Sequence, residues 1–200
     1  MFLEEADARD LAGRIANNAR RLDRLVTNLL DMDRLARGIV TPKRDETDVG
    51  ALVGRVAAES ELVPRARLAA ELEPVVQLID VAKVERIVEN LLANAVRHAP
   101  STSTIWVGVE PQPTGVMIAV EDDGPGVPEE LRETVFEPFR QGPDAPQHSP
   151  GVGVGLALVR RFAELLGGRA WVQEREGGGA SFRVFLPSEP PLPAGPAATI

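Results

Sequence analysis

Cysteine is absent from this sequence of 200 residues, so disulfide bonds and thiolate metal sites are excluded. No apolar run approaches the roughly 20 residues that a membrane-spanning helix requires. The N-terminus carries Glu4, Glu5 and Asp7 and lacks the basic region of a signal peptide. With these features missing, the cytoplasm is the expected compartment.

The chain also has no excess of basic residues, and its formal net charge is −8. Nucleic acid is therefore not an expected partner, since its phosphates would require a basic face. The 44% of hydrophobic residues is enough for a core, and the length suggests one domain with an appendage or two small units. An acidic chain can still bind an anionic nucleotide where backbone amides, arginines and Mg²⁺ supply the positive field.

A long amphipathic segment at residues 4–37 is predicted to form one helix, which Gly38 would end. Apolar positions with one polar exception recur at alternating spacings of four and three, namely Leu11, Ile15, Asn18, Leu22, Leu25, Leu29 and Met32. This heptad repeat is typical of a seam between helices. An amphipathic helix lying on its own domain is one interpretation. Half of a helical hairpin or bundle is the other, and the narrowness of the stripe favours it.

The rest of the chain alternates between helical and β-rich patterns after a polar connector at residues 38–46. Thr47 or Asp48 is suited to cap a helix that ends near Ser60, and Asp80 to cap the next. The further helices are expected at 81–98, 129–135 and 154–166, and the strands at 65–71, 75–78, 104–109, 116–120, 170–174 and 180–186. This order predicts an α+β fold, a two-layer sandwich in which about three helices cover one side of a mixed sheet. Residues 141–151 are predicted to be a mobile loop and the Pro-rich tail 188–200 to be disordered.

The first candidate site lies on the predicted helix 81–98. Asn90 and Asn94 are four residues apart, so both amides face the same way, opposite the apolar side of that helix. An amide oxygen is a hard, neutral ligand suited to Mg²⁺, and Asn94 is the candidate metal ligand. Arg97 and His98 follow one turn later, where they can reach phosphate and ribose or base. Two solvated asparagines are the alternative, although asparagine is a poor helix former.

The second candidate motif is Asp122-Asp-Gly124-Pro-Gly126, directly after a predicted strand. A carboxylate at Asp122 can accept a hydrogen bond from the exocyclic amine of adenine, whereas guanine presents a carbonyl there. Gly124 and Gly126 allow a tight turn and the close approach of a flat base to the backbone. A simple turn is the alternative, because Asp-Gly and Pro-Gly are common turn pairs.

The third motif is Gly151-Val-Gly153-Val-Gly155, at the start of a predicted helix. Bare N–H groups at such a start bind phosphate, with a glycine hinge as the alternative. The spacing differs from the dinucleotide fingerprint, since no glycine stands at the sixth place. A P-loop is also excluded, because Lys43 follows proline and Lys83 follows alanine.

Together these motifs, with Phe136-Glu-Pro-Phe139 between the second and third, resemble the catalytic ATP-binding domain of sensor histidine kinases. The resemblance runs from about Thr47 to Pro187. It implies the Bergerat fold, with ATP and Mg²⁺ under a lid formed by residues 141–150. The residues matching the family's ATP-binding boxes are Asn90, Asn94, Arg97, His98, Asp122, Gly124, Gly126, Phe136, Phe139, Gly151, Gly153, Gly155 and Leu156. Among these, Asn94 matches the Mg²⁺ ligand, and Asn90 and Arg97 are the residues expected to act in catalysis.

The N-terminal segment departs from the family pattern. Residues 18–32 look like the second helix of the dimerisation and phosphotransfer hairpin, but the first helix, with its phosphoaccepting histidine, does not precede them. Neither His98 nor His148 stands in a matching sequence context. We therefore expect a fragment of a longer kinase, divided into residues 1–46, 47–187 and 188–200. It would dimerise through the N-terminal helix and act on a partner histidine, with a response regulator downstream.

The phosphate acceptor is expected to be protein rather than water. ATP-hydrolysing relatives carry a glutamate base four residues before the metal-binding asparagine, and here that place is Asn90, which cannot accept a proton at neutral pH. Two alternatives remain open. A serine kinase or switch protein of the anti-sigma type is less favoured by the heptad helix, and a non-catalytic nucleotide-binding module is less favoured by the completeness of the motifs.

Overall fold

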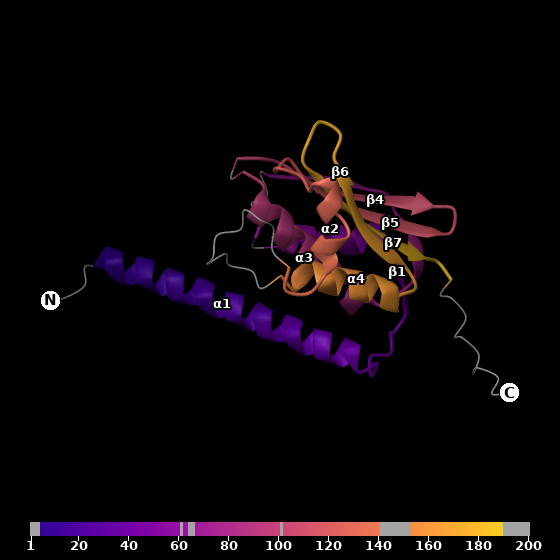
Figure 1. Cartoon of the computed structure of the whole chain (residues 1–200), viewed down its shortest axis with the longest axis horizontal. Coiled ribbons are helices and arrows are strands. Elements are labelled where there is room, and N and C mark those ends of the chain that lie inside the picture. The colour runs from indigo at the N-terminus through magenta and orange to yellow at the C-terminus, as the bar shows by residue number, and fades with distance from the viewer. Residues whose placement is uncertain (1–4, 61, 64–66, 101, 141–152, 190–200) are drawn as a thin grey trace.

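The computed structural model describes residues 5–60, 62–63, 67–100, 102–140 and 153–189. Helices α2, α3 and α4 cover one face of a five-stranded sheet, and α1 lies outside this two-layer body (Figure 1). The helices are α1 (Glu5–Ala36), α2 (Val49–Glu59), α3 (Val81–His98) and α4 (Gly155–Leu165), with 3₁₀ turns η2 (Glu129–Leu131) and η3 (Thr134–Phe136). The strands are β1 (Asp45–Asp48), β2 (Leu68–Leu72), β3 (Val76–Ile79), β4 (Ile105–Gln112), β5 (Gly115–Asp122), β6 (Arg169–Glu174) and β7 (Ala180–Pro187).

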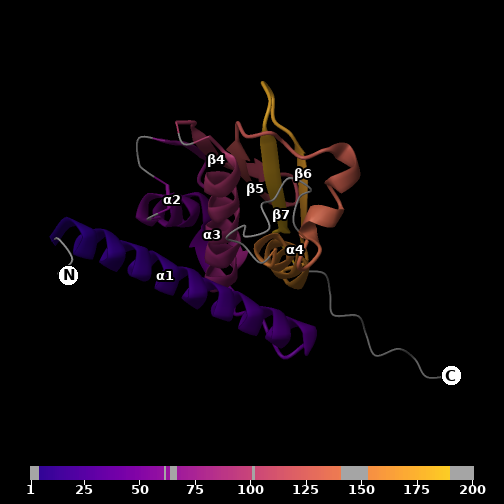
Figure 2. The same cartoon turned by 60° about the vertical axis from the view of Figure 1, so that its left-hand side comes forward.

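The main sheet is mixed, as the sequence predicts. Its strand order is β2-β4-β5-β7-β6, with β2 parallel to β4 and the other neighbours antiparallel. Alternate residues of the central strands are buried, Val107, Ile118 and Val184 among them. The helices lie over one face of this sheet (Figure 2). The predicted α+β sandwich with three helices on one side is confirmed.

The helix caps follow the predicted pattern. Asp48 accepts a hydrogen bond from the Ala51 N–H at 3.3 Å, and Asp80 accepts one from Lys83 N–H at 3.1 Å. Asp80 is buried and also accepts from the Lys43 backbone at 2.8 Å, which ties the connector to α3. These bonds satisfy donors that a helix start leaves unpaired, so α2 and α3 begin at defined residues.

Two local predictions were wrong. The end of the connector is strand β1, which pairs with β3 in a separate two-stranded sheet, so β2 and β3 join different sheets. Its residues, Asp-Glu-Thr-Asp, have little β propensity, and the strand exists only through a partner some thirty positions away. The helix expected at 129–135 is two 3₁₀ turns, where the Thr134 hydroxyl bonds to the Leu131 carbonyl and offers the backbone an alternative to helical pairing.

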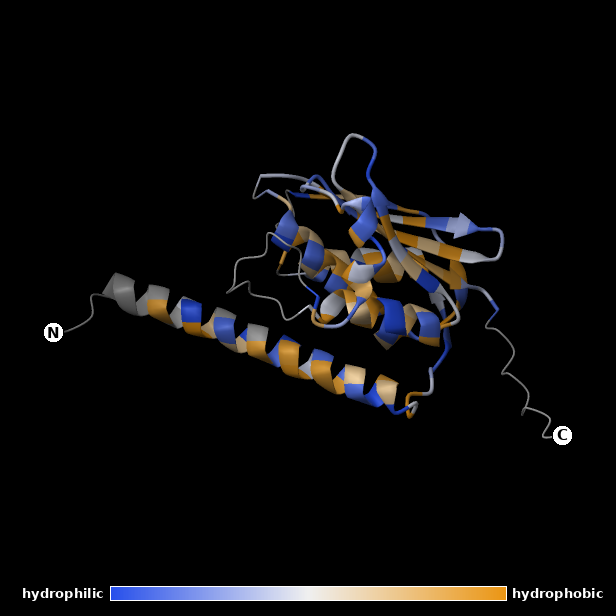
Figure 3. Cartoon of the chain, in the orientation of Figure 1, coloured by the Kyte–Doolittle hydropathy of each residue, from blue (hydrophilic) through white to orange (hydrophobic). Residues whose placement is uncertain are grey.

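Helix α1 contacts the body through described side chains that include Asn28 and Asp31, which meet α3, and Met32 and Leu35, which pack against the core. It spans 32 residues and ends at Ala36, two residues before Gly38, whose φ of +66° is the left-handed conformation of a helix stop. Met32 and Leu35 pack against the core, whereas Leu11, Ile15 and Leu22 are 45–63% exposed. Apolar and polar residues alternate around its surface (Figure 3). The end of the helix near Met32 and Leu35 lies on its own domain, and the pairing of its exposed part with another helix stays a prediction. Among the described helices, none has the length and apolarity to cross a membrane.

Candidate functional site

Helix α3 presents the asparagine pair on the side away from the sheet. Val88, Leu91 and Leu92 are at most 1% exposed, while Asn90 and Asn94 are half-buried. This is the arrangement that a spacing of four residues predicts. Within the described part of the chain the Asn94 side chain makes no hydrogen bond, so its amide oxygen is available as a donor atom for a hard cation.

The side chain of Asn90 is already engaged within the protein. Its Nδ2 donates to the Arg86 carbonyl at 2.7 Å, and its Oδ1 accepts from Asn28 Nδ2 at 3.4 Å. Asn28 belongs to α1 and was not predicted to be near the site. It lies outside the heptad seam, and nothing in the local sequence distinguishes it from the other polar residues of this amphipathic helix.

The C-terminal end of α3 carries Arg97 and His98, both on the surface. Partial burial lowers the pKa of His98, and the positive charge of Arg97 lowers it further, so the neutral imidazole is favoured. The His98 carbonyl lies against the turn after β5, because a Cβ added at Gly124 would be 2.9 Å from this oxygen. The second motif therefore packs directly on the end of the helix that carries the first.

Asp122 ends β5 and is 1% exposed. Its Oδ1 accepts the Gly124 N–H at 2.9 Å, whereas its buried Oδ2 has no hydrogen-bond partner among the described residues. Burial raises the pKa of this carboxyl, an effect that the backbone N–H groups of Gly124 and Ala180 oppose. A buried acceptor without a partner is costly in a folded protein, and it fits a ligand donor such as the amine of adenine.

The turn between β6 and β7 supports this carboxylate, a role that the sequence analysis missed. Gly179 has φ +101°, and a Cβ added there would overlap the Asp122 carbonyl oxygen. Gly126, with φ +73°, faces the Gly179 carbonyl, which would lie 3.1 Å from an added Cβ. The three consecutive glycines at 177–179 were the only available signal, and they look the same as any glycine-rich hairpin.

The start of α4 lies beside Asn90. A Cβ at Gly155 would be 2.9 Å from Asn90 Oδ1, and among the described residues no side chain caps the helix at Val154. Uncapped N–H groups at a helix start are suited to bind phosphate. Gly153 has φ +71°, and its carbonyl accepts the Phe139 N–H at 2.9 Å. Gly151 and the predicted lid at 141–150 lie outside the described residues.

The remaining predicted residues differ in their surroundings. Phe136 is 2% exposed and meets Phe182 edge to face, with centroids 6.3 Å apart. Phe139 is 65% exposed and holds a φ of +64°, which is unusual for a large side chain. Leu156 is half-buried and packs against the core. Phe136 and Leu156 thus have structural contacts that account for them, whereas Phe139 is largely exposed, two residues before the start of the predicted lid.

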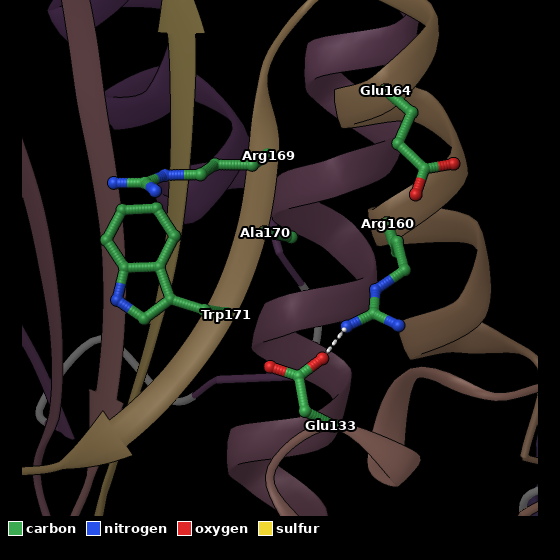
Figure 4. A pocket seen from close by; sticks show the side chains of 6 residues that line it. All are labelled: Glu133, Arg160, Glu164, Arg169, Ala170 and Trp171. Carbon is green, nitrogen blue, oxygen red and sulfur yellow. Dashed lines mark hydrogen bonds and ion pairs between the residues drawn. The ribbon is translucent and has the colours of Figure 1, made fainter.

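Two surface hollows lie apart from these motifs. One has a volume of about 420 Å³ and is lined by Glu133, Arg160, Glu164, Arg169, Ala170 and Trp171 (Figure 4). Arg160 pairs with Glu133 at 2.8 Å, and Arg169 stacks on Trp171 at 4.8 Å. The second, of about 450 Å³, lies between the β4–β5 turn and Gly168. The charges of the first hollow are balanced and its arginines are engaged, so it indicates no ligand of its own.

Comparison with known proteins gives a consistent result. Residues 79–190 match the family model of the histidine kinase-, DNA gyrase B-, and HSP90-like ATPases. The hybrid signal transduction histidine kinase D of Dictyostelium discoideum is 35% identical over 88% of this chain and 12% of its own length. The sensor protein KdpD of Escherichia coli is 33% identical over 89% of this chain and 20% of its own length. The chain therefore spans a minor part of these relatives.

Solved structures support the fold. The histidine kinase AdeS of Acinetobacter baumannii superimposes with a TM-score of 0.71 at 20% identity, covering 94% of this chain and 87% of its own. Full-length ShkA in complex with AMPPNP has a TM-score of 0.71 at 25% identity, covering 96% of this chain and 42% of its own. Both coverages of this chain extend beyond the family match, so they include part of α1 as well as the body.

Proposed function

We propose that this chain, which belongs to the histidine kinase-, DNA gyrase B-, and HSP90-like ATPase family and carries the catalytic ATP-binding domain of a sensor histidine kinase, presents the γ-phosphate of Mg²⁺-ATP to a histidine outside the chain. The observation that carries this proposal is the buried Oδ2 of Asp122, which has no hydrogen-bond partner in the part of the chain that the structure describes and lies beside a turn of permissive glycines. A carboxylate in this state fits the amine of adenine.

Different residues of the chain would contact the base, the phosphates and the metal of Mg²⁺-ATP. Asp122 would accept the adenine amine, and the turn containing Gly124 and Gly126 would face the base. The first N–H groups of α4 would bind phosphate oxygens. Asn94 would hold Mg²⁺ through its amide oxygen, and the bound metal would neutralise charge on the β- and γ-phosphates. Arg97, on the surface one turn beyond Asn94, would add a second positive charge.

The surroundings of Asn90 support a protein acceptor. An amide cannot accept a proton at neutral pH, and this one is hydrogen-bonded to the Arg86 carbonyl and to Asn28. A neutral imidazole nitrogen is a sufficient nucleophile by itself. As its bond to the γ-phosphorus forms, the bond from that phosphorus to the bridging oxygen breaks and ADP leaves with that electron pair. The proton on the other imidazole nitrogen is then released to solvent. The contribution of Asn90 and Arg97 is then positioning and charge neutralisation.

Partners beyond ATP follow from the same assignment. The exposed apolar seam of α1 would pair with a second copy, because its heptad spacing is that of a helix–helix seam. The acceptor histidine would come from a helix of the same or a partner kinase chain, and a response regulator would receive the phosphoryl group. We assign the reaction to the cytoplasm, where ATP is available.

The test supplies the acceptor separately. The purified chain, γ-labelled ATP and a histidine-bearing helix from a homologous hairpin are incubated with Mg²⁺, and acid-labile phosphate is measured on each component. We expect label on the added helix and none on this chain, whose described histidine, His98, lies on the nucleotide-binding helix. Asn94→Ala should abolish both the transfer and the Mg²⁺ enhancement of ATP binding. Label on this chain alone, or full Mg²⁺ dependence in the variant, would refute these assignments.

A further inference from the structure

A ring of three hydrogen bonds joins α1 to the asparagine motif. Arg86 donates to Asn28 Oδ1 at 2.7 Å, Asn28 Nδ2 donates to Asn90 Oδ1 at 3.4 Å, and Asn90 Nδ2 returns to the Arg86 carbonyl at 2.7 Å. Asn28 is only 9% exposed, although the helix around it is largely open to solvent. A buried amide bonded on both sides is a specific contact rather than an incidental one.

Arg86 anchors the ring through ion pairs, but one of its hydrogen-bond donors has no partner in the described part of the chain. The Arg86 guanidinium also lies 3.4 Å from Asp31 of α1 and 3.0 Å from Glu89 of α3. Its Nε is buried without a hydrogen-bond partner in the described part of the chain. An unpaired buried donor raises the free energy of the docked arrangement. The contacts that hold the docked helix include these polar bonds and the packing of Met32 and Leu35 against the core. Because an unpaired buried donor stands among them, the docked arrangement is less favourable than a fully bonded one.

The atom shared between the ring and the site is Asn90 Oδ1. It faces the start of α4, where Gly155 leaves no room for a side chain, and it belongs to the residue one turn before Asn94. Mg²⁺ retains several waters when it binds to proteins, and each of these waters is a strong donor. An amide oxygen can accept two hydrogen bonds. Asn90 Oδ1 already lies against both Asn28 and the start of α4, so a metal-bound water would have to compete with the Asn28 N–H for it.

We infer that Asn28 is a positioning residue that makes docking of α1 and binding of Mg²⁺-ATP mutually antagonistic through Asn90. The inference depends on the proposed nucleotide site, and it adds a route by which the N-terminal helix regulates that site. When α1 is docked, the Asn90 amide is fixed to Asn28 and Arg86. When Mg²⁺-ATP engages Asn90, the ring opens and α1 is less firmly held. Linkage requires that each event weaken the other by the same factor.

The first test compares two asparagine variants on the same helix. Asn28→Ala should tighten Mg²⁺-ATP binding by roughly twofold to tenfold, the worth of one neutral hydrogen bond, while ATP affinity in EDTA stays near that of the unchanged chain. Asn18→Ala, at an exposed position of α1, is the matched control and should have no effect. Asp31→Asn, which weakens the anchor of Arg86 but leaves the ring, should shift affinity in the same direction by less.

The second test observes the helix itself. The chain has no cysteine, so spin labels at Ala19→Cys on α1 and Arg161→Cys on α4 report a single distance. Mg²⁺-ATP should broaden and lengthen this distance distribution, and Asn28→Ala should do so without nucleotide. Circular dichroism confirms that each variant keeps the fold, so a change in affinity is not a loss of structure.

The outcomes separate this inference from the proposed function. If the chain binds ATP and Asp122→Asn weakens that binding, but Asn28→Ala behaves as Asn18→Ala or binds more weakly, the antagonism is refuted and the proposed function stands. A distance distribution unchanged by Mg²⁺-ATP refutes it as well. If the unchanged chain fails to bind ATP, the proposed function fails first.

Discussion

The buried carboxylate of Asp122 is expected to bind the base of ATP and, because it is buried, to lower the stability of the fold. Asp122→Asn keeps the acceptor for the Gly124 N–H but replaces the free carboxylate oxygen, so ATP affinity should fall by about 1.5–3 kcal/mol, the usual worth of a hydrogen bond to a charged group. Titration calorimetry measures this directly. Unchanged affinity would remove Asp122 as the group that recognises the base.

The same substitution should stabilise the fold at neutral pH. Burial raises the folded-state pKa of Asp122 above its ordinary value of 3.8, so the native state binds the extra proton and wild-type stability falls as pH rises from that value through the raised pKa. Asparagine carries no charge and escapes this loss. We expect the thermal midpoint of Asp122→Asn to exceed that of the wild type at pH 7 and the difference to shrink near pH 3.8. A lower midpoint at pH 7 would contradict the burial argument.

At the scale of elements, the glycine turn between β6 and β7 maintains the floor of the site. Gly179→Ala combines the strain of a left-handed φ, about 1–3 kcal/mol, with an overlap of the new Cβ and the Asp122 carbonyl. It should therefore destabilise the domain and also weaken ATP binding. Thermal unfolding and nucleotide titration measure the two effects.

Gly178 provides the matched control for this turn. It has a similar φ of +95°, but a Cβ there would have nothing within 4 Å. Gly178→Ala should show the loss of stability without the loss of affinity. Equal affinity losses in both variants would mean that the turn acts through general destabilisation rather than through its contact with Asp122.

The elements that the sequence predicts well are those defined by local chemistry. Helix α3 begins at a capping aspartate, Asp80, and keeps its apolar period to His98, so its bounds and the shared face of Asn90 and Asn94 could be predicted. Strand β1 could not, because only its pairing with β3 makes it a strand. The contacts of Gly179 and Asn28 were equally inaccessible, since each depends on a segment more than fifty residues away, and local periodicity contains no information about such partners.

At the scale of the whole molecule, α1 has an apolar surface that the body does not cover. Leu22 is 63% exposed and Ile15 60% exposed, and both belong to the heptad, whereas the docked end of the helix uses Met32 and Leu35. Burying a leucine contributes about 1.5–3 kcal/mol, and a seam of several such residues is enough to hold two copies together. The hydrogen-bonded ring at Asn28, in contrast, joins α1 to α3 of its own chain. One helix thus serves two contacts.

Substitution of the seam should therefore separate the copies. Leu22→Asp places a charge in each helix of the pair and should raise the dissociation constant of the dimer at least tenfold, measured by sedimentation equilibrium. Ile39→Asp is the control, because Ile39 is 67% exposed and apolar but lies beyond the end of α1. A wild-type chain that sediments as a monomer at every concentration, or equal effects of the two substitutions, would place the dimer contact elsewhere. Retained Mg²⁺-ATP binding in Leu22→Asp would show in addition that the nucleotide site is complete within one copy.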